Sequence, residues 1–381
     1  MENFTAFNPV KIHFGKNVID LLPNEIPDSL KTILIITGKN SSKKYGYLDQ
    51  IIRVLKNKTI VTFDQIKPNP RIEEVYKAIE VARQNNVDAI VALGGGSVID
   101  SAKMINIAYA SGTDPWQIIM GEAKPTTKIP LFVILTLAAT GSEMNGAAVI
   151  QNAKSKLKKG FFHPLMFPDV SFLDPQFTLT VPENHTRNGL VDTLSHALEA
   201  YFACGDAPLT DNFTISVLKE LEEISIPLLN NLRNYDLRAR HMWVATVALN
   251  GTLYHGRKAS GDWGVHALAH DISLLFDTPH GETLSIVYPA WLQVKKFKLK
   301  SKLKFLAQGI YNKKSARSFD FIDWLKDYFK QIGAPLSLKD IGITQNESEK
   351  LLQLWKNHLP QGTCHKNSEK ELDEIFKLIN E

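Results

Sequence analysis

The segment at residues 88–110, DAIVALGGGSVIDSAKMINIAYA, joins an apolar run, a glycine turn and a helical pattern. The run at 88–93 is typical of a strand that is buried on both faces of a sheet. Three glycines follow at 94–96, and residues 98–110 carry apolar side chains at helical spacing. The N–H groups and dipole at a helix start attract anions, and glycines let the backbone approach them. We therefore predict a phosphate-binding turn, with Ser97 as N-cap or phosphate donor.

This glycine turn differs from the usual dinucleotide fingerprint. Ile99 occupies the position of the last glycine in G-x-G-x-x-G. The alternative is a tight strand-to-helix turn that binds no ligand. Three glycines are more than such a turn needs, which favours the phosphate-binding interpretation.

The same alternation extends to both sides of the glycine turn. Further buried strands are predicted at 32–37, 59–63, 131–136 and 170–174, and helices at 43–55 and 71–84. Such a βαβ series predicts a parallel sheet with right-handed crossovers. From about Pro182 the segments are long and helical in period. We predict an α/β domain over residues 1–180 and an all-α domain over residues 181–381.

A second polar turn, GKNSSK at residues 38–43, follows the predicted strand at 32–37. In dinucleotide folds this turn lies near the adenosine ribose, where an acid favours a free 2′-hydroxyl and cations or hydroxyls accommodate a 2′-phosphate. No acid occurs here before Asp49. The turn at Gly38 and Ser41 therefore favours NADP, although NAD remains possible and a solvated loop without ligand is the alternative.

Composition and charge exclude some classes of protein. The chain has 44 basic and 40 acidic residues, a formal charge of +4, and nine of the basic residues lie at 295–317, which holds no acid. This balance does not indicate a nucleic-acid binder, and we interpret the basic stretch as one solvated helix face. No apolar run reaches the roughly 18 residues of a membrane span, and the N-terminus lacks a signal-peptide pattern. We expect a cytoplasmic protein without nucleic-acid or membrane partners.

The chain has two cysteines, Cys204 and Cys364. They lie far apart in the sequence and outside any C-x-x-C motif, so neither a disulfide framework nor a thiolate zinc site is indicated. We expect both to be small buried apolar residues.

Aspartate and histidine recur in two later segments. In NGLVDTLSHALEAYF, residues 188–202, Asp192 and His196 are four apart and share one helical face. In DWGVHALAHDISLLFDTPHGE, residues 262–282, His266 and His270 have the same spacing, and His280 follows a proline. Because Pro279 and Gly281 should break a helix, we expect a loop to present His280.

One carboxylate and up to four imidazoles predict a site for one divalent transition metal, Fe(II) or Zn(II). The set is too rich in nitrogen for Mg or Ca. Taken singly, each histidine could instead be a satisfied core residue. Spacing alone does not decide which of His266 and His270 is a ligand, and catalytic sites keep an open position, so one candidate can be an acid/base group.

These motifs together resemble the iron-containing, or group III, alcohol dehydrogenase family. The resemblance runs from FNPVKIHFGKNVID, at residues 7–20, to about Pro289, and includes GGGSVIDSAK, TLAATGSEMN and the two aspartate/histidine segments. It implies a Rossmann-like N-terminal domain, an α-helical C-terminal domain, an active site in the cleft between them and a homodimer.

The resemblance also implies roles for single residues. Asp192, His196, His266 and His280 would be the metal ligands, and His270 a proton relay or positioning residue. Residues that would bind the dinucleotide are Gly38, Ser41, Asn69, Gly95, Gly96, Ser97, Asp100, Thr136, Ser142, Lys158 and Phe177.

The implied activity is reversible hydride transfer between a nicotinamide and an aldehyde or alcohol. Gly38 stands where NAD-preferring relatives resemble one another in having aspartate, which is similar to the NADPH-dependent, butanol-dehydrogenase-like branch. The alternatives are a metal-dependent hydrolase, a glycerol-dehydrogenase-like enzyme, and a binding protein without catalysis. A hydrolase would need no dinucleotide, so it would leave the predicted phosphate-binding turn unexplained.

Overall fold

The computed structural model describes all 381 residues, which form two compact units. The sheet unit comprises Phe7–Pro182 and Leu232–Thr246, and the helical unit comprises Met1–Ala6, Glu183–Asn231 and Val247–Glu381. The chain therefore passes between the units more than once, because its first six residues join the helical unit.

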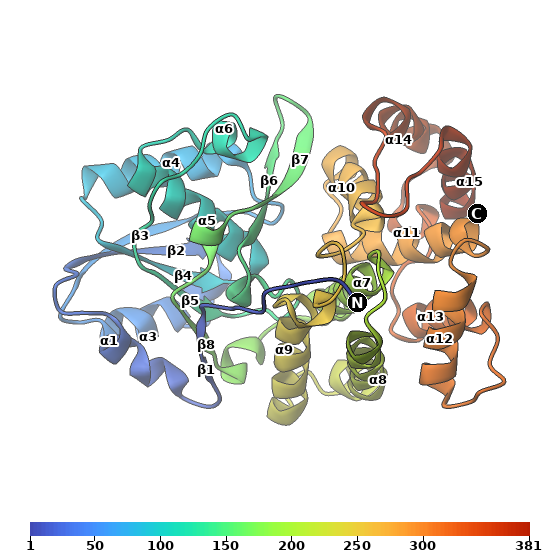
Figure 1. Cartoon of the computed structure of the whole chain (residues 1–381). Helices are drawn as coiled ribbons and strands as arrows, with labels where there is room; N and C mark the ends of the chain where they lie inside the picture. The colour runs from blue at the N-terminus through green and yellow to red at the C-terminus, as the bar shows by residue number, and fades with distance from the viewer. The chain divides into compact units, whose positions relative to one another are not determined.

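A six-stranded parallel sheet forms the centre of the sheet unit, with the strand order β1-β8-β5-β4-β2-β3 (Figure 1). Its strands are β1 Lys11–Phe14, β2 Thr32–Gly38, β3 Thr59–Ile66, β4 Ala89–Gly94, β5 Leu131–Leu135 and β8 Val170–Leu173. Five of them coincide with the predicted buried runs. The predicted parallel α/β architecture is thus confirmed.

Apolar side chains alternate along each central strand, so both faces of the sheet are buried. Leu34 and Ile36 of β2 join the core formed with helices α4 Ile72–Gln84, α5 Gly96–Ser111 and α6 Pro115–Met120. Ile33 and Ile35 join the opposite core, formed with α1 Leu22–Glu25 and α3 Tyr47–Val54. This double covering explains why the strands appear in the sequence as continuous apolar runs.

The strand order reverses beside β2. The chain adds β3 on one side of β2 and then places β4 on the other side, followed by β5 and β8. In open α/β sheets ligands bind at such a switch point, beyond the carboxyl ends of the strands. The glycine turn after β4 lies there.

Several elements of the sheet unit differ from the prediction, among them the short helices α1 and α6, which were not predicted. The helix expected at 43–55 is divided into α2 Ser41–Lys44 and α3, and two sets of strands were not predicted. One is the short edge strand β1, and the other is the antiparallel hairpin of β6 Ala147–Asn152 and β7 Leu157–Phe162.

The helical unit contains no strand, which confirms the predicted all-α class. Its helices are α7 Glu183–Phe202, α8 Pro208–Asn230, α10 Gly264–Phe276, α11 His280–Lys295, α12 Lys300–Tyr311, α13 Asp320–Gln331, α14 Gln345–His358 and α15 Glu369–Asn380. Helix α9, Tyr235–Leu249, begins in the segment of the sheet unit, where Met242 and Ala245 join the core under α4 and α5.

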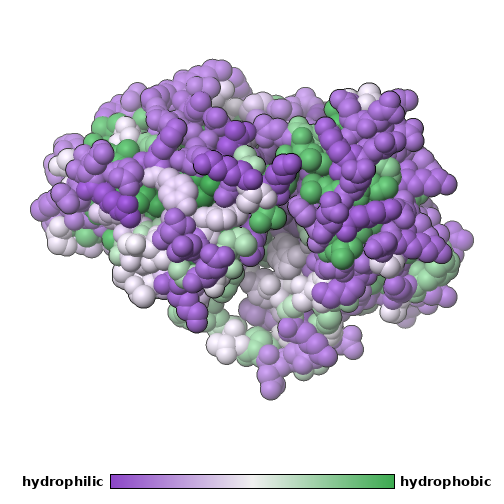
Figure 2. All heavy atoms as spheres, turned by 90° about the horizontal axis from the view of Figure 1, so that it is seen from above, coloured by the Kyte–Doolittle hydropathy of each residue, from purple (hydrophilic) through white to green (hydrophobic).

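Hydrophilic side chains cover most of the face drawn in Figure 2, with smaller hydrophobic areas among them. None of the helices combines the length and the apolar character that crossing a membrane requires.

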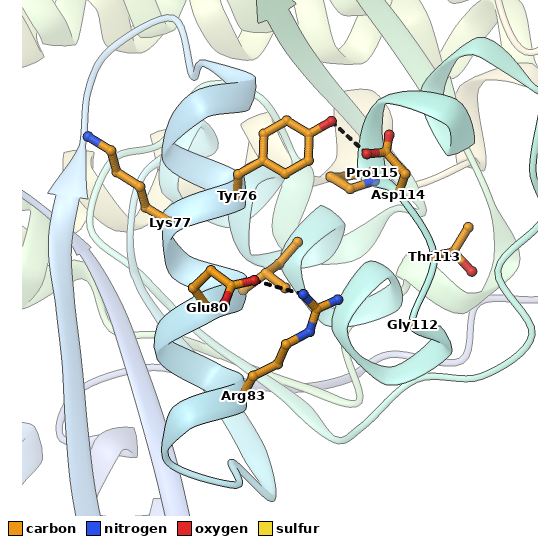
Figure 3. Close-up of a pocket in the computed structure, with 9 residues that line it drawn as sticks. Tyr76, Lys77, Glu80, Arg83, Gly112, Thr113, Asp114 and Pro115 are labelled. Atoms are coloured by element: carbon orange, nitrogen blue, oxygen red, sulfur yellow. Dashed lines mark hydrogen bonds and ion pairs between the residues drawn. The ribbon is translucent and has the colours of Figure 1, made fainter.

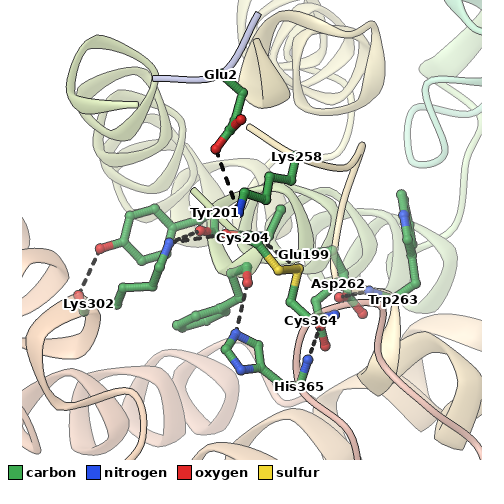
Figure 4. The surroundings of a disulfide bond; sticks show 12 residues. Glu2, Glu199, Tyr201, Cys204, Lys258, Asp262, Trp263, Lys302, Cys364 and His365 are labelled. Atoms are coloured by element: carbon green, nitrogen blue, oxygen red, sulfur yellow. Dashed lines mark hydrogen bonds and ion pairs between the residues drawn. A yellow bond between two sulfur atoms is a disulfide. The ribbon is translucent and has the colours of Figure 1, made fainter. Parts of the chain in front are cut away.

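The expectation for the two cysteines was wrong, because Cys204 and Cys364 form a disulfide with a Cα–Cα distance of 5.6 Å (Figure 4). Neither residue is fully buried. The bond joins the end of α7 to the segment before α15, across 160 residues of sequence. Sequence spacing does not reveal a pairing that only the helix packing creates.

The interpretation of the basic stretch as one solvated helix face was also wrong. It spans the end of α11, a turn, α12 and the segment that follows, and two of its lysines are wholly or partly buried. The Lys295 side chain is fully buried, and its Nζ donates to Lys366 O at 2.7 Å and contacts Glu371 at 2.9 Å. Lys302 Nζ donates to Tyr201 O at 2.8 Å, and burial lowers the pKa of Lys302 to about 8.

A surface groove of about 420 Å³ lies between α4 and the segment before α6 (Figure 3). Two pairs of its polar side chains bond to each other: Tyr76 Oη donates to Asp114 at 2.8 Å, and Arg83 donates to Glu80 at 2.7 Å. None of the residues expected to bind the cofactor or a metal lines it. We assign no ligand to this groove.

The buried Lys295–Glu371 pair yields a stability prediction. Burial opposes ionisation of Glu371, but hydrogen bonds from Lys298, the Ser368 N–H and Lys295 together lower its pKa to about 2. Glu371→Gln leaves the Lys295 ammonium without its carboxylate, so the free energy of unfolding at pH 7 should fall by about 2 kcal/mol in urea titrations.

The pH dependence gives a second measurement on the same variant. A carboxyl whose pKa is lowered on folding stabilises the protein above pH 4.5 and loses this contribution as the pH falls toward 2. The wild type should therefore lose more stability than Glu371→Gln over this window. Glu374→Gln, on an exposed face of the same helix, is the control and should match the wild type. Equal stability of all three proteins would contradict a role for the pair.

Candidate functional site

Three helices of the helical unit carry the predicted metal ligands. Asp192 and His196 lie one turn apart on α7, and His266 and His270 lie one turn apart on α10. His280 begins α11. Because residues four apart on a helix share one face, each pair points to one side of its helix.

Ligand atoms of Asp192, His196 and His266 all lie within 4.8 Å of one another, and all three residues are buried. The distances from Asp192 Oδ1 to the Nε2 atoms of His196 and His280 are 3.6 and 3.9 Å. The His266 ring centroid lies 5.0 Å from that of His196 and 5.2 Å from that of His280. The structure thus brings together the four residues that spacing and resemblance indicated.

The surroundings of the Asp192 carboxylate show whether a cation fits this cluster. Its Oδ1 atom is buried and has no hydrogen-bond partner, although two imidazole nitrogens face it at distances too long for hydrogen bonds. Burying a carboxylate oxygen in this way is costly unless a cation or donor compensates it. One carboxylate and several imidazoles are the donor set of a divalent transition metal such as Fe(II) or Zn(II), so the residues present fit the group.

His280 differs from its prediction in one respect. We expected a loop to present it, but it is the first residue of α11, and Pro279 is the N-cap. Pro279 separates α10 from α11, as predicted, yet proline before the first turn is compatible with a helix start. Gly281 brings α11 close to α7, since a Cβ atom there would lie 2.5 Å from Asn188 O.

Two other histidines have separate positions. The His270 ring is partly exposed, 5.1 Å from the His280 ring and 6.3 Å from the His266 ring. It therefore borders the cluster without joining its three buried members. His255 stacks on Phe4 at 5.0 Å instead.

Two further residues contact the cluster, and sequence reasoning missed the first of them. Glu199 on α7 lies 2.8 Å from His266 Nδ1, and burial raises the pKa of Glu199 to about 7. Trp263, the N-cap of α10, packs edge-on against His196 and His266, with centroids 6.3 and 5.2 Å away. Glu199 could have been found, because it follows His196 by three residues on the same helical face and interrupts an apolar run.

In the sheet unit, the expected dinucleotide residues gather at one edge of the sheet. Gly38 ends β2, Gly94 ends β4, and Thr136 follows β5, and these three strands are parallel neighbours. Thr136 N donates to Gly94 O at 3.0 Å. The carboxyl ends of the strands therefore meet at the glycine turn.

The glycine turn makes a close approach that a side chain would prevent. A Cβ atom on Gly96 would lie 2.4 Å from Thr140 Cγ2. The helix α5 begins at Gly96, and its N-cap is Gly95, so the prediction of Ser97 as N-cap was wrong. Ser97 instead lies in the first turn, where helix N–H groups have no partner within the helix.

Beneath the turn, Asp100 and Ser142 belong to a buried polar network. Ser142 Oγ donates to Asp100 Oδ1 at 2.6 Å, and the other Asp100 oxygen accepts from Val149 N at 2.8 Å. Lys103 Nζ donates to Ser142 Oγ at 2.8 Å and to Asn145 Oδ1 at 3.0 Å. This network holds the segment after β5 against α5.

The remaining expected cofactor residues have different surroundings. Lys158 of β7 donates to Asn69 Oδ1 at 2.9 Å, so the structure joins these two. Phe177 is buried, with its ring 4.7 Å from that of Tyr47. Ser41 is exposed at the start of α2.

Sequence reasoning also missed an acid near the adenosine turn. Asp64, near the end of β3, pairs with Lys43 of α2, and this hydrogen bond lowers the Asp64 pKa. The sequence 38–49 shows no earlier acid, but the parallel pairing of β2 with β3 brings Asp64 to the turn.

The chain is similar to known proteins over both of its units. The sequence model described as iron-containing alcohol dehydrogenase matches residues 9–175, and that of the Fe-containing alcohol dehydrogenase family, C-terminal, matches residues 186–379. A probable NADH-dependent butanol dehydrogenase 1 of Bacillus subtilis is 38% identical over 357 residues, covering 91% of this chain and 92% of that protein.

Two further proteins are similar over nearly their whole length. The NADPH-dependent aldehyde reductase YqhD of Escherichia coli is 36% identical and covers 94% of both chains. The crystal structure of NADH-dependent butanol dehydrogenase A from Thermotoga maritima superposes with a TM-score of 0.95, at 34% identity, over 100% of this chain and 99% of that one. With its sheet, its helical unit and its aspartate/histidine cluster, the chain belongs to the iron-containing alcohol dehydrogenase family.

Proposed function

We propose that this enzyme reduces short apolar aldehydes with NADPH, and that Asp192, His196, His266 and His280 hold its divalent metal. The observation that carries the metal assignment is the buried Asp192 Oδ1 atom, 3.6 and 3.9 Å from two imidazole nitrogens. The family membership makes the reaction a nicotinamide-linked oxidation or reduction of an alcohol or aldehyde.

When bound, the metal supplies Lewis acidity toward a carbonyl oxygen and the nicotinamide supplies the hydride. The residues of the chain provide position and protons. His270 borders the cluster and is partly exposed, so an N–H of its ring donates the proton that the product hydroxyl needs. In this proposal the four ligands hold the metal, and His270 at the border of the cluster exchanges protons with the substrate and with water.

The apolar substrate class rests on Trp263. Its ring makes T-shaped contacts with the His196 and His266 rings, which gives this side of the cluster an apolar surface that should limit access of water. Two of the similar proteins are named butanol dehydrogenases and one an aldehyde reductase, which supports a small aliphatic aldehyde such as butanal. The family resemblance also supports a homodimer, which sedimentation of the purified protein tests.

The choice of NADPH rests on the adenosine turn. Gly38 has no carboxylate to accept a ribose 2′-hydroxyl, and Lys39 and Lys43 lie in the same turn. Cations accommodate a 2′-phosphate. Asp64 opposes this preference because it pairs with Lys43, so NADH should be a weaker second substrate.

The direct test mixes the purified, metal-loaded enzyme with butanal and NADPH or NADH and follows nicotinamide absorbance. We expect absorbance to fall with both cofactors, with a higher kcat/KM for NADPH. No oxidation of either cofactor by any of a panel of aldehydes would contradict the proposal and favour the metal-dependent hydrolase.

The ligand assignment predicts the effect of His280→Ala. The variant should lose bound metal, measured by elemental analysis after desalting, and turnover, because one of the four donors is removed. NADPH binding, measured by fluorescence, should persist, because the predicted dinucleotide residues lie in the other unit. The control is His255→Ala, which removes a histidine that stacks on Phe4 and should keep both metal and turnover. Full turnover of His280→Ala without metal would show that the assignment is wrong.

The adenosine turn yields a prediction on cofactor choice. Asp64→Asn frees Lys43 for a 2′-phosphate, and since an exposed ion pair is worth up to about 1 kcal/mol, the NADPH/NADH ratio of kcat/KM should rise by about fivefold. Lys43→Met should lower the ratio. Asp49→Asn, a nearby acid outside the pair, serves as the control. An unchanged ratio in both Asp64→Asn and Lys43→Met would contradict the placement of the 2′-phosphate at this turn.

A further inference from the structure

We propose that Glu199 is a positioning residue that fixes the His266 ring with its Nε2 atom toward the metal. This inference rests on the proposed function, because it takes His266 as a ligand. It adds a residue that is itself neither a ligand nor a group that touches the substrate.

The contacts of Glu199 converge on the start of α10. Its Oε1 atom lies 2.8 Å from His266 Nδ1 and accepts from the His266 N–H at 3.0 Å. Its Oε2 atom accepts from the Trp263 N–H at 2.5 Å. The ionised Glu199 carboxylate accepts from two backbone N–H groups and from the His266 ring, whose proton is then held on Nδ1. Nε2 is then the nitrogen whose lone pair is available to a metal.

The position of Glu199 on α7 makes this contact part of the same site. Asp192, His196 and Glu199 follow one another at intervals of four and three residues, which places them along one face of the helix. One helix therefore supplies two ligands directly and orients a third ligand on α10. A rotation or displacement of the His266 ring would break its hydrogen bond to Glu199 on α7.

The backbone around Glu199 is held from a second side. Asp262 N donates to Glu199 O at 3.0 Å, and Asp262 Oδ1 accepts from the N–H groups of Cys364 and His365, each at 2.8 Å (Figure 4). The disulfide ties Cys364 to Cys204, just beyond the end of α7. Glu199 and the start of α10 thus belong to one cross-linked frame, which consists of the end of α7, Asp262 and the disulfide-bonded segment at Cys364.

Trp263 shows that this frame constrains the backbone. It has a φ of 64°, in the left-handed region that a bulky residue rarely adopts. Its N–H is held by Glu199 and its ring lies against His266. Such strained residues persist where the surroundings over-determine them, often at functional sites.

A purely structural cap on α10 is the competing explanation, and metal affinity separates the two. Carboxylates that orient ligand histidines typically change metal affinity by 10- to 100-fold. Glu199→Gln retains an acceptor oxygen for Nδ1–H, so its affinity for Zn(II), measured against a chromophoric chelator, should fall about tenfold, and that of Glu199→Ala about a hundredfold. The visible bands of the Co(II)-substituted protein should shift in both variants.

The control is Asp262→Asn, which alters the neighbouring buried carboxylate but keeps an oxygen for the Cys364 and His365 N–H groups. It should bind Zn(II) as the wild type does, and thermal unfolding of the metal-free proteins verifies that all variants fold. Wild-type affinity and Co(II) spectrum in folded Glu199→Ala would overturn the positioning role, and so would equal losses in Asp262→Asn and Glu199→Gln. If the wild type itself binds no Zn(II) or Co(II), the proposed metal site fails before Glu199 is tested.

Discussion

A buried carboxylate among imidazole rings is the constraint on which the helical unit depends. Asp192 Oδ1 has no hydrogen-bond donor, and the nitrogens that face it come from α7 and α11, while α10 places a third ring beside them. Removing a charge from water costs several kcal/mol per ion unless the surroundings repay it. Several features of the sequence build this cluster. Asp192 and His196 are four residues apart on α7, Gly281 lets α11 approach Asn188 of α7 closely, and Glu199 contacts His266. A site this specifically built fits a metal-dependent member of the iron-containing alcohol dehydrogenase family.

The sheet unit is the proposed site of the dinucleotide, and its geometry rests on a different principle. Its parallel strands end at one edge, and the reversal of strand order beside β2 leaves room there for a ligand. Gly96 allows α5 to start against Thr140, so that helix N–H groups are available to a phosphate at a place that a side chain would block. Under the proposed placement of the 2′-phosphate, cofactor choice would depend on weaker, exposed charges, since Lys43 also pairs with Asp64. We therefore expect cofactor preference to change with single substitutions more readily than metal binding does.

How much the sequence predicts depends on whether a feature is local. Strands β2, β4 and β5 are buried on both faces, so their apolar runs can be recognised in the sequence. The proximity of Asp192 and His196 follows from helical spacing alone. The edge strand β1 has only four residues with one exposed edge, which leaves little pattern to detect. Features created by packing between distant segments could not be predicted: the disulfide across 160 residues, Asp64 beside Lys43, and the burial of Lys295 against Glu371. The helix break before His280 was predicted correctly, but the loop expected there is the start of α11, since proline at an N-cap is compatible with a helix start.

In the proposed assignment, one metal ion is held by one carboxylate oxygen and three imidazole nitrogens from three helices. Anomalous diffraction from crystals of the metal-loaded protein, recorded on both sides of the absorption edge of iron or zinc, tests it most directly. We predict one strong peak per chain, bonded to Asp192, His196, His266 and His280, with His266 bound through Nε2 and its Nδ1 on Glu199. A peak bonded to His270 in place of His280, or no peak among these residues in crystals whose protein contains one metal per chain, would contradict the account.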